Sequence, residues 1–517
     1  MSYRRVIIFL VVVASAWQAR AASYYVDYSG GSDTNVGTST LTPWQHCPGD
    51  AAAAGVAGST MLSGGDIVIF KGGVTYDVDS TRYISLSVSG SSDNPIIYRS
   101  GDLAGWGTGS AFIDATGGTT TSHIIRLSSV SWVTIDGIVM GNLEINGPYT
   151  GFIGGTVGTP GNITIQNCTV TNSAGNGMYF QGLFGSAGTN PSTITVSNCV
   201  VRDTQWHGIF FRYGLDDLTV INCTIFNSGV DLVGGSFEGD NITFYRGSTD
   251  QMRNIKVNGN DISTSPEKGH ILFYSPMTDV DVSGNYFHGT NRTGGLLFGV
   301  SMTNATFYNN VFETKISQYE GIYRFNTDSG NMVIDGMEVY NNSIQCELAS
   351  GSIFFFNRGN CTFDTMFYNV SIKNCVVDST GANRPAIQIY ANSAGTGPVM
   401  DMATFDSDYN TFAVASGSLF TYRGTNYTLA AWRTLTSGDA NSQEDTPEFA
   451  AGEPALRLAA SDTVARGNGV NLSAYFTTDK DGNVRPLSGP WDIGAYSGQV
   501  TTTARLGPGK PVGGGRR

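Results

Sequence analysis

The chain has 517 residues, of which 14% are charged, and its formal net charge is −13. An ordinary soluble domain has about 25% charged residues, and the 67 glycines are about twice the usual share. This acidic balance, without a basic stripe, excludes a nucleic-acid partner. It does not exclude an acidic polysaccharide, because a local cationic cleft can lie on an acidic body.

The first residues have the pattern of an export signal. Arg4 and Arg5 precede an apolar run from Val6 to Ala14, and Ala19-Arg20-Ala21 is a small-x-small cleavage site. We therefore expect residues 1–21 to be a signal peptide and the mature protein to be secreted, into the medium or the periplasm. The alternative is a retained N-terminal anchor. No later segment reaches about 18 uninterrupted apolar residues, so we expect no membrane association after cleavage.

A short pattern then repeats along the chain. It reads apolar-x-apolar-x-(Asn/Gly)-(Asn/Cys)-x-apolar, with clear copies at 163–170, 194–201, 218–225, 255–262, 280–287, 305–312, 337–344 and 370–377, and a weaker one at 133–140. Alternation marks strands with one buried face, and unequal spacing is typical of a solenoid whose coils carry loops. Crossovers between parallel strands are right-handed in nearly all cases. The pattern predicts an all-β fold, a right-handed single-stranded parallel β-helix over residues 22–403.

The sixth position of the pattern holds either asparagine or cysteine. Such a position needs a small inward side chain at a turn, where asparagine can bond to its neighbour in the next coil. We expect buried free thiols rather than disulfides at Cys168, Cys199, Cys223 and Cys375. Cys346 and Cys361 remain a candidate disulfide, and Cys47 has no evident partner.

A second strand follows most copies of the pattern and is rich in aromatic residues. Examples are 177–180, 208–211, 241–244, 270–273, 295–298, 321–324 and 352–355. Because neighbouring residues of a strand face opposite sides, its rings can fill the interior or form an outer platform. The sequence leaves both alternatives open.

Both ends of the predicted helix resemble known proteins. The segment Tyr24–Thr38 with Pro43-Trp44 resembles the opening of secreted β-helix carbohydrate enzymes in the pectate-lyase-like superfamily. A second resemblance, to the closing module of bacterial β-helix repeat proteins, rests on Ser407–Asn410, Trp432, Asp439, Pro447–Phe449 and Asp492–Tyr496. The resemblance implies a monomeric polysaccharide-active protein with a closing segment at 404–500. Residues 501–517, rich in Gly and Pro, are expected to be a disordered tail.

Ionisable residues gather around the second strands between positions 207 and 324. Stacked coils bring equivalent side chains together, so we expect one groove. As catalytic candidates we select Lys268, His207, His270, Asp240 and Arg212, and as substrate-binding candidates Glu238, Tyr245, Arg246, Tyr274, Glu320 and Arg324.

Two enzyme chemistries fit this cluster. A uronate lyase needs a base, with Lys268, His207 or His270 as candidates, and a cationic clamp, with Arg212, Arg246 or Arg324 as candidates. A glycoside hydrolase needs two carboxylates, which Asp240 would form with Glu238 or Glu320. We expect the lyase on a uronate-containing polysaccharide. The alternatives are the hydrolase and a non-catalytic, adhesin-like carbohydrate-binding solenoid whose charges form ordinary surface ion pairs.

Calcium is the one cofactor that the sequence suggests. Asp479–Asn483 can form a calcium loop, although Asp-Gly-Asn is first a turn signal. Asp216-Asp217 is a weaker candidate, and His46-Cys47 lacks further metal ligands nearby. No metal is assigned to the candidate groove.

Overall fold

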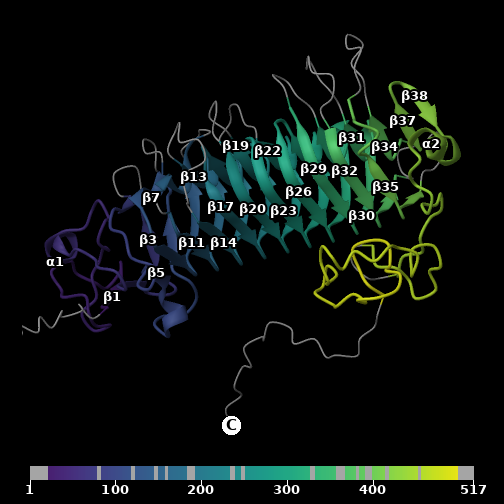
Figure 1. The fold of residues 1–517 in the computed structure, drawn as a ribbon. Coiled ribbons are helices and arrows are strands. Elements are labelled where there is room, and N and C mark those ends of the chain that lie inside the picture. The colour runs from purple at the N-terminus through teal and green to yellow at the C-terminus, as the bar shows by residue number, and fades with distance from the viewer. Residues whose placement is uncertain are drawn as a thin grey trace, which may run out of the picture.

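The computed structural model is a right-handed parallel β-helix with three long sheets along its axis (Figure 1). It describes residues 21–78, 83–117, 123–144, 149–157, 161–182, 193–232, 239–245, 251–325, 332–356, 367–379, 384–389, 399–413, 419–451 and 456–498. The predicted fold class is therefore confirmed. The signal peptide, apart from Ala21, and the tail lie outside the described residues.

Each coil contributes one strand to each sheet, in the order A, C, B. Sheet A consists of β1 (Ser23–Val26), β2 (Ile67–Phe70), β5 (Ile96–Ser100), β8 (Val133–Asp136), β11 (Ile163–Gln166), β14 (Ile194–Ser197), β17 (Asp216–Ile221), β20 (Met252–Asn258), β23 (Met277–Ser283), β26 (Met302–Tyr308), β29 (Ile334–Tyr340), β32 (Phe367–Lys373) and β35 (Asp406–Asp408). Sheet C consists of β3 (Thr75–Asp77), β6 (Phe112–Asp114), β9 (Val139–Leu143), β12 (Thr169–Ser173), β15 (Val200–Thr204), β18 (Thr224–Ser228), β21 (Asp261–Ser265), β24 (Tyr286–Asn291), β27 (Val311–Glu320), β30 (Ser343–Ser350), β33 (Val376–Asp378) and β36 (Thr411–Ala413).

Sheet B, which carries the candidate site, closes each coil. It consists of β4 (Ile84–Leu86), β7 (His123–Val130), β10 (Gly151–Val157), β13 (Asn176–Gln181), β16 (Ile209–Arg212), β19 (Ile242–Tyr245), β22 (Gly269–Tyr274), β25 (Gly294–Phe298), β28 (Tyr323–Phe325), β31 (Phe354–Phe356), β34 (Ile387–Ile389), β37 (Phe420–Tyr422) and β38 (Thr425–Tyr427). Only the β37–β38 pair is antiparallel among these strands. The helices are α1 (Gly55–Ser59), the 3-10 turn η1 (Gly101–Ala104) and α2 (Leu429–Thr436).

The repeated motif forms the corner between sheets A and C. Its fifth residue has a positive φ, as at Asn167 (55°) and Gly284 (64°), a conformation that asparagine and glycine tolerate. The sixth residue then points inward and bonds along the axis. Asn260 Nδ2 donates to Asn285 Oδ1, and Asn285 Nδ2 to Asn310 Oδ1, each at 3.0 Å. The predicted asparagine ladder is confirmed.

The predicted free thiols stand in the same ladder. Cys168, Cys199, Cys223 and Cys375 are buried and unbridged, and the backbone N–H of Cys199 donates to Cys223 Sγ at 3.4 Å. Burial raises the pKa of the Cys375 thiol to about 12. Cys346 is a buried free thiol in the structure, whereas Cys361 lies outside the described residues, so their pairing stays a prediction.

Aromatic residues of sheet B fill the interior. Phe rings stack from coil to coil at 5.0–5.6 Å, in the series Phe180, Phe211, Phe244, Phe273 and Phe298. The residues between them, such as Tyr179 and Phe210, face outward. The two alternatives for the second strand are therefore both realised, by alternate residues. A separate strand in sheet C, after the ladder, was not distinguished from the sequence.

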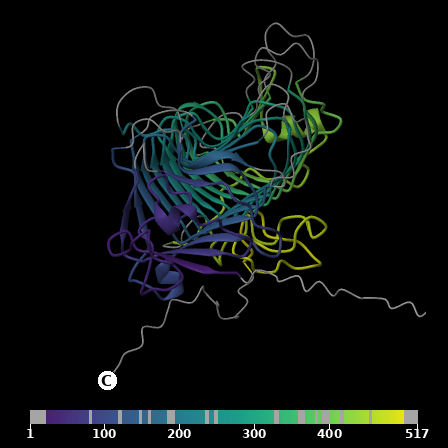
Figure 2. The same cartoon turned by 90° about the vertical axis from the view of Figure 1, so that its left-hand side faces the viewer.

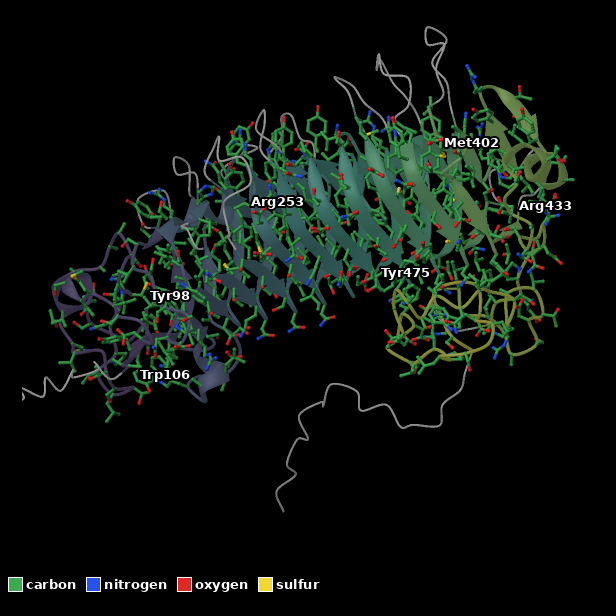
Figure 3. All side chains as sticks on the ribbon, in the orientation of Figure 1. Tyr98, Trp106, Arg253, Met402, Arg433 and Tyr475 are labelled. Atoms are coloured by element: carbon green, nitrogen blue, oxygen red, sulfur yellow. The ribbon has the colours of Figure 1, made fainter. Side chains whose placement is uncertain are left out.

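The C-terminal segment folds back along the outside of the coils (yellow in Figures 1 and 2). Tyr475 packs against Tyr340 of β29 at 5.0 Å (Figure 3). The buried Arg485 donates to Asn309 Oδ1 at 3.0 Å. The last coil, β35 to β37, lies within the predicted closing segment 404–500. Among the described residues, no helix is long and apolar enough to cross a membrane.

Candidate functional site

A pocket of about 310 Å³ opens on the outer face of sheet B. Its walls come from coils that span β16 to β28, near the middle of the solenoid. The lining residues are His207, Asp240, Tyr245, Lys268, Leu272, Tyr274, Thr293, Leu297, Phe298, Gly299 and Arg324. Eleven site residues were predicted, and the structure describes the side chains of eight of them. Six of these eight line the pocket: His207, Asp240, Tyr245, Lys268, Tyr274 and Arg324.

The strand register explains why these distant residues meet. Arg212, Tyr245 and Tyr274 are direct partners on β16, β19 and β22, as their equal distance from the apolar strand residues predicted. Leu272, Leu297 and Arg324 form the neighbouring outward column on β22, β25 and β28. Neighbouring parallel strands lie about 4.8 Å apart, so each column presents one side chain per coil to the same groove.

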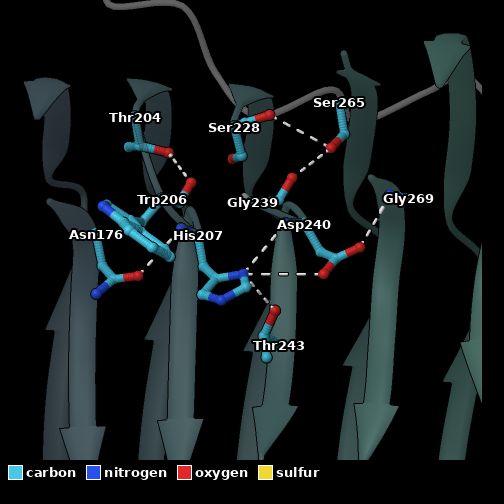
Figure 4. A network of polar contacts seen from close by, with 10 residues as sticks. All are labelled: Asn176, Thr204, Trp206, His207, Ser228, Gly239, Asp240, Thr243, Ser265 and Gly269. Atoms are coloured by element: carbon cyan, nitrogen blue, oxygen red, sulfur yellow. Dashed lines mark hydrogen bonds and ion pairs between the residues drawn. The ribbon is translucent and has the colours of Figure 1, made fainter. Parts of the chain in front are cut away.

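His207 is held by two donors at one ring nitrogen (Figure 4). The backbone N–H of Asp240 donates to His207 Nδ1 at 3.1 Å, and Thr243 Oγ1 lies 2.7 Å from the same nitrogen. A backbone N–H only donates, so Nδ1 carries no proton, and the proton of the neutral ring is on Nε2. Burial, then the charge of Lys268, lowers the pKa of His207 to about 3. The ring is therefore a neutral donor through Nε2, not a base.

Asp240 is the acidic group of the pocket. Its side chain is 1% exposed, and Oδ1 accepts from the backbone N–H of Gly269 at 2.8 Å (Figure 4). Oδ2 lies 3.8 Å from His207 Nδ1, which is too long for a hydrogen bond. Among the described lining residues, Asp240 is the sole carboxylate. A two-carboxylate hydrolysis therefore needs a partner from outside this set.

Two cations and two stacked rings complete the polar lining. Lys268 and Arg324 are half-buried, and Arg324 lies two coils further along the helix than Lys268. Leu272 and Leu297 also line the pocket, on β22 and β25. The rings of Tyr245 and Tyr274 stack with centroids 5.3 Å apart and an interplanar angle of 22°. The lining thus combines cationic groups, phenol rings and an apolar floor. This combination suits a flat ligand that carries negative charge.

Two predicted catalytic residues take other places. The prediction of His270 as a base is wrong, because its side chain is 0% exposed and packs inside the helix, 5.4 Å from the ring of Phe287. Arg212 faces outward, but it lies outside the pocket lining, beneath Tyr149. Glu238 and Arg246 lie outside the described residues, and so does the side chain of Glu320, so these three stay predictions.

Other functional positions were missed from the sequence. Thr243, Leu272 and Leu297 read as ordinary strand residues, and Thr293 as a loop residue. Thr243 shares an outward column with Leu272 and Leu297. The strand register therefore identifies Thr243 as a residue of the same face. Arg126 on β7 was also missed, although it lies in an outward position of sheet B.

The outer face of sheet B differs in charge from the other faces. Within the strand ranges given above, sheet B contains no Asp, Glu or Lys, and its charged residues are Arg126, Arg212 and Arg324. The strands of sheets A and C carry both signs, with acidic residues in excess. In an acidic protein, the strands of sheet B thus carry positive charge alone, and the pocket lies on their outer face.

The predicted calcium loop forms a turn in which one carboxylate is fully engaged. Asp479 accepts from the backbone N–H groups of Asp481, Asn483 and Ser497 at 2.8–2.9 Å. Within the described residues, no three His, Cys, Asp or Glu side chains gather as a metal site. His46 Nδ1 lies 2.8 Å from Asp33 Oδ2. Among the described residues, neither the Asp479–Asn483 loop nor the Asp216-Asp217 pair belongs to a group of three potential metal ligands.

Comparisons with known proteins agree with the fold. Residues 125–262 match the family model described as a right handed beta helix region. A solved structure of XylC with xylose is 10% identical, covers 92% of this chain and 98% of its own, and has a TM-score of 0.54. The chain is a right-handed parallel β-helix protein.

Two further solved structures align with this chain at lower TM-scores. Pectate lyase Pel9A is 15% identical over 92% of this chain and 96% of its own, with a TM-score of 0.42. A lacto-N-biosidase of Eubacterium ramulus is 13% identical over 75% of this chain and 67% of its own, with a TM-score of 0.38. No curated protein sequence matches the chain significantly. At such identities, the likeness concerns the fold, and the activity has to be argued from the site.

Proposed function

We propose that this β-helix is a secreted enzyme that cleaves a uronate-containing polysaccharide by β-elimination in the pocket on sheet B. The observation that carries the proposal is the charge of that face. Its strands bear arginine as their only charged residue, and the pocket adds Lys268. A polyanionic chain is the ligand that such a face attracts. The xylose in the XylC structure supports a sugar ligand.

The elimination assigns a role to each polar group. A base removes the proton from the carbon beside the carboxylate, the electron pair forms a carbon–carbon double bond, and the bond to the leaving sugar oxygen breaks. Lys268 is the base, since His270 is inside the helix and His207 Nδ1 is occupied by donors. Arg324 stabilises the charge that develops on the carboxylate.

His207 serves the leaving group. Its Nε2–H donates a hydrogen bond to the departing oxygen, which takes its proton from solvent water, while Thr243 and the Asp240 backbone hold the ring. Asp240 is fixed by Gly269 and orients this corner of the pocket.

The test is incubation with a panel of uronate polysaccharides, including polygalacturonate, alginate and glucuronan. The ultraviolet absorbance of the unsaturated sugar should grow with wild-type protein and be abolished in K268Q. K256Q, on the exposed face of sheet A, is the matched control and should keep full activity. New reducing ends without absorbance would instead indicate hydrolysis, and binding without either product would indicate a carbohydrate-binding solenoid.

A further inference from the structure

An arginine outside the pocket is held between tyrosine rings. The guanidinium carbon of Arg212 lies 3.9 Å from the ring centroid of Tyr149 and 4.1 Å from that of Tyr213. Arg212 Nη1 is 3.2 Å from Tyr179 Oη, which itself donates to Gln181 at 2.6 Å. We call Arg212 with these three tyrosines the Arg212 cage. The stacking fixes the direction of the guanidinium before any ligand binds.

The described residues supply no carboxylate to the Arg212 cage. No carboxylate among the described residues forms an ion pair with Arg212, and its buried Nε has no hydrogen-bond partner there. A partly buried charge normally has a partner, because removal from water is costly. The rings offset part of this cost, and a bound carboxylate would offset the rest through a two-pronged contact.

The same design occurs three coils earlier. The guanidinium carbon of Arg126 lies 3.3 Å from the ring centroid of Tyr83, and its Nε donates to the backbone oxygen of His123 at 3.2 Å. No carboxylate pairs with Arg126 within the described part of the chain either. Two ring-stacked arginines, on β7 and β16, therefore stand in neighbouring outward columns of sheet B.

The register connects both arginines with the pocket. Arg212 on β16 pairs with the pocket residue Tyr245, which pairs with Tyr274. From β7 to β22 the sheet takes five strand steps, about 24 Å at the spacing of parallel strands. One step is close to the length of one pyranose residue. A sugar chain along the helix axis would then pass the Arg212 cage at the N-terminal end of the pocket, one coil before Tyr245, and Arg126 three coils further toward the N-terminus.

We infer that Arg126 and the Arg212 cage bind carboxylates of uncleaved sugars on the N-terminal side of the pocket. The inference rests on the proposed acidic substrate and deepens it: the protein selects a run of uronates, not a single charged sugar at the cleavage point. Affinity should grow with chain length until Arg126 is reached. The cleft is thus suited to the interior of a long acidic polymer.

The test is calorimetric titration of trimers and octamers of galacturonate and of mannuronate. R212Q and R126Q should each lose about tenfold in affinity for the octamer, the scale of a lost hydrogen bond to a charged group, and much less for the trimer. R253Q, on the exposed face of sheet A, is the matched control and should bind as wild type. If R212Q fails to fold, as judged by circular dichroism, R212K keeps the charge without the planar fork and should still show the loss.

The outcomes separate the two proposals. Octamer binding by R212Q and R126Q that equals the wild type would overturn the inference, whatever the activity. Weaker octamer binding by these variants, with no unsaturated product from the wild type, would support the inference and overturn the lyase. Failure of the wild type to bind either acidic octamer would overturn both.

Discussion

Acid should destabilise this protein through its buried His270. The side chain is 0% exposed, and neither ring nitrogen has a hydrogen-bond partner within the described residues. Burial, followed by the charge of His288, lowers the pKa of His270 to about 3. In an unfolded chain, histidine titrates near about 6.5. The unfolded state therefore takes up the proton first, so stability is full above about pH 6.5 and is lost as the pH falls toward about 3.

The size of the effect follows from the distance between the two pKa values. Between pH 7 and pH 5, the unfolded state gains about 2 kcal/mol from this group, since each pH unit below about 6.5 is worth about 1.4 kcal/mol. H270N replaces the ring with asparagine, the residue that stands at the equivalent position one coil earlier, Asn241. The loss of unfolding free energy from pH 7 to pH 5 should be about 2 kcal/mol smaller in H270N than in wild type.

Urea unfolding followed by tryptophan fluorescence measures this difference directly. Comparing the two proteins at both pH values cancels every other titrating group, including Asp439, whose burial raises its pKa to about 6. Equal losses in wild type and H270N would refute the reasoning.

Three further predictions follow from single contacts. F273A should lower the unfolding free energy by about 3–5 kcal/mol, because the ring stacks between Phe244 and Phe298, whereas F226A on sheet C should cost less in the same urea titration. T243V should lower kcat about fivefold with little change in KM, because about 1 kcal/mol of hydrogen bonding to His207 is lost. T243S should restore the rate, and a T243V enzyme at full rate would contradict this role. Ellman's reagent should leave Cys168, Cys199, Cys223 and Cys375 unlabelled in the native protein and label them in guanidinium, and native labelling would contradict the buried ladder.

The fold was predictable because one motif encodes one corner. Alternating β-branched residues, a residue that tolerates positive φ and a small inward side chain recur together, so the coil and its parallel stacking followed from local chemistry. The column Arg212, Tyr245, Tyr274 was also predictable, because register is constant along a parallel sheet. The third strand of each coil was not, since the motif contains both the end of the sheet A strand and the start of the sheet C strand, with only the two corner residues between them, as Asn167 and Cys168 lie between β11 and β12.

The error in the predicted site concerned His270, which lies at the start of a strand. Asp240 pairs with Gly269, so Lys268 and His270 lie one residue on either side of that column, and only Lys268 reaches the groove. Strict alternation would place His270 outward with Leu272 and Tyr274, but the alternation breaks at the start of β22, where the ring of His270 packs inward against Phe287. The role of His207 depends on a backbone N–H from the next coil, and no sequence pattern shows such a contact.

The central claim is that the outer face of sheet B binds acidic sugar chains. A crystal structure of the K268Q protein with an octamer of the uronate that the wild type cleaves tests it most directly. The account predicts sugars along the helix axis, with one ring in the pocket and a carboxylate at Arg212. An octamer bound on sheet A or sheet C, with the sheet B pocket empty, would contradict it.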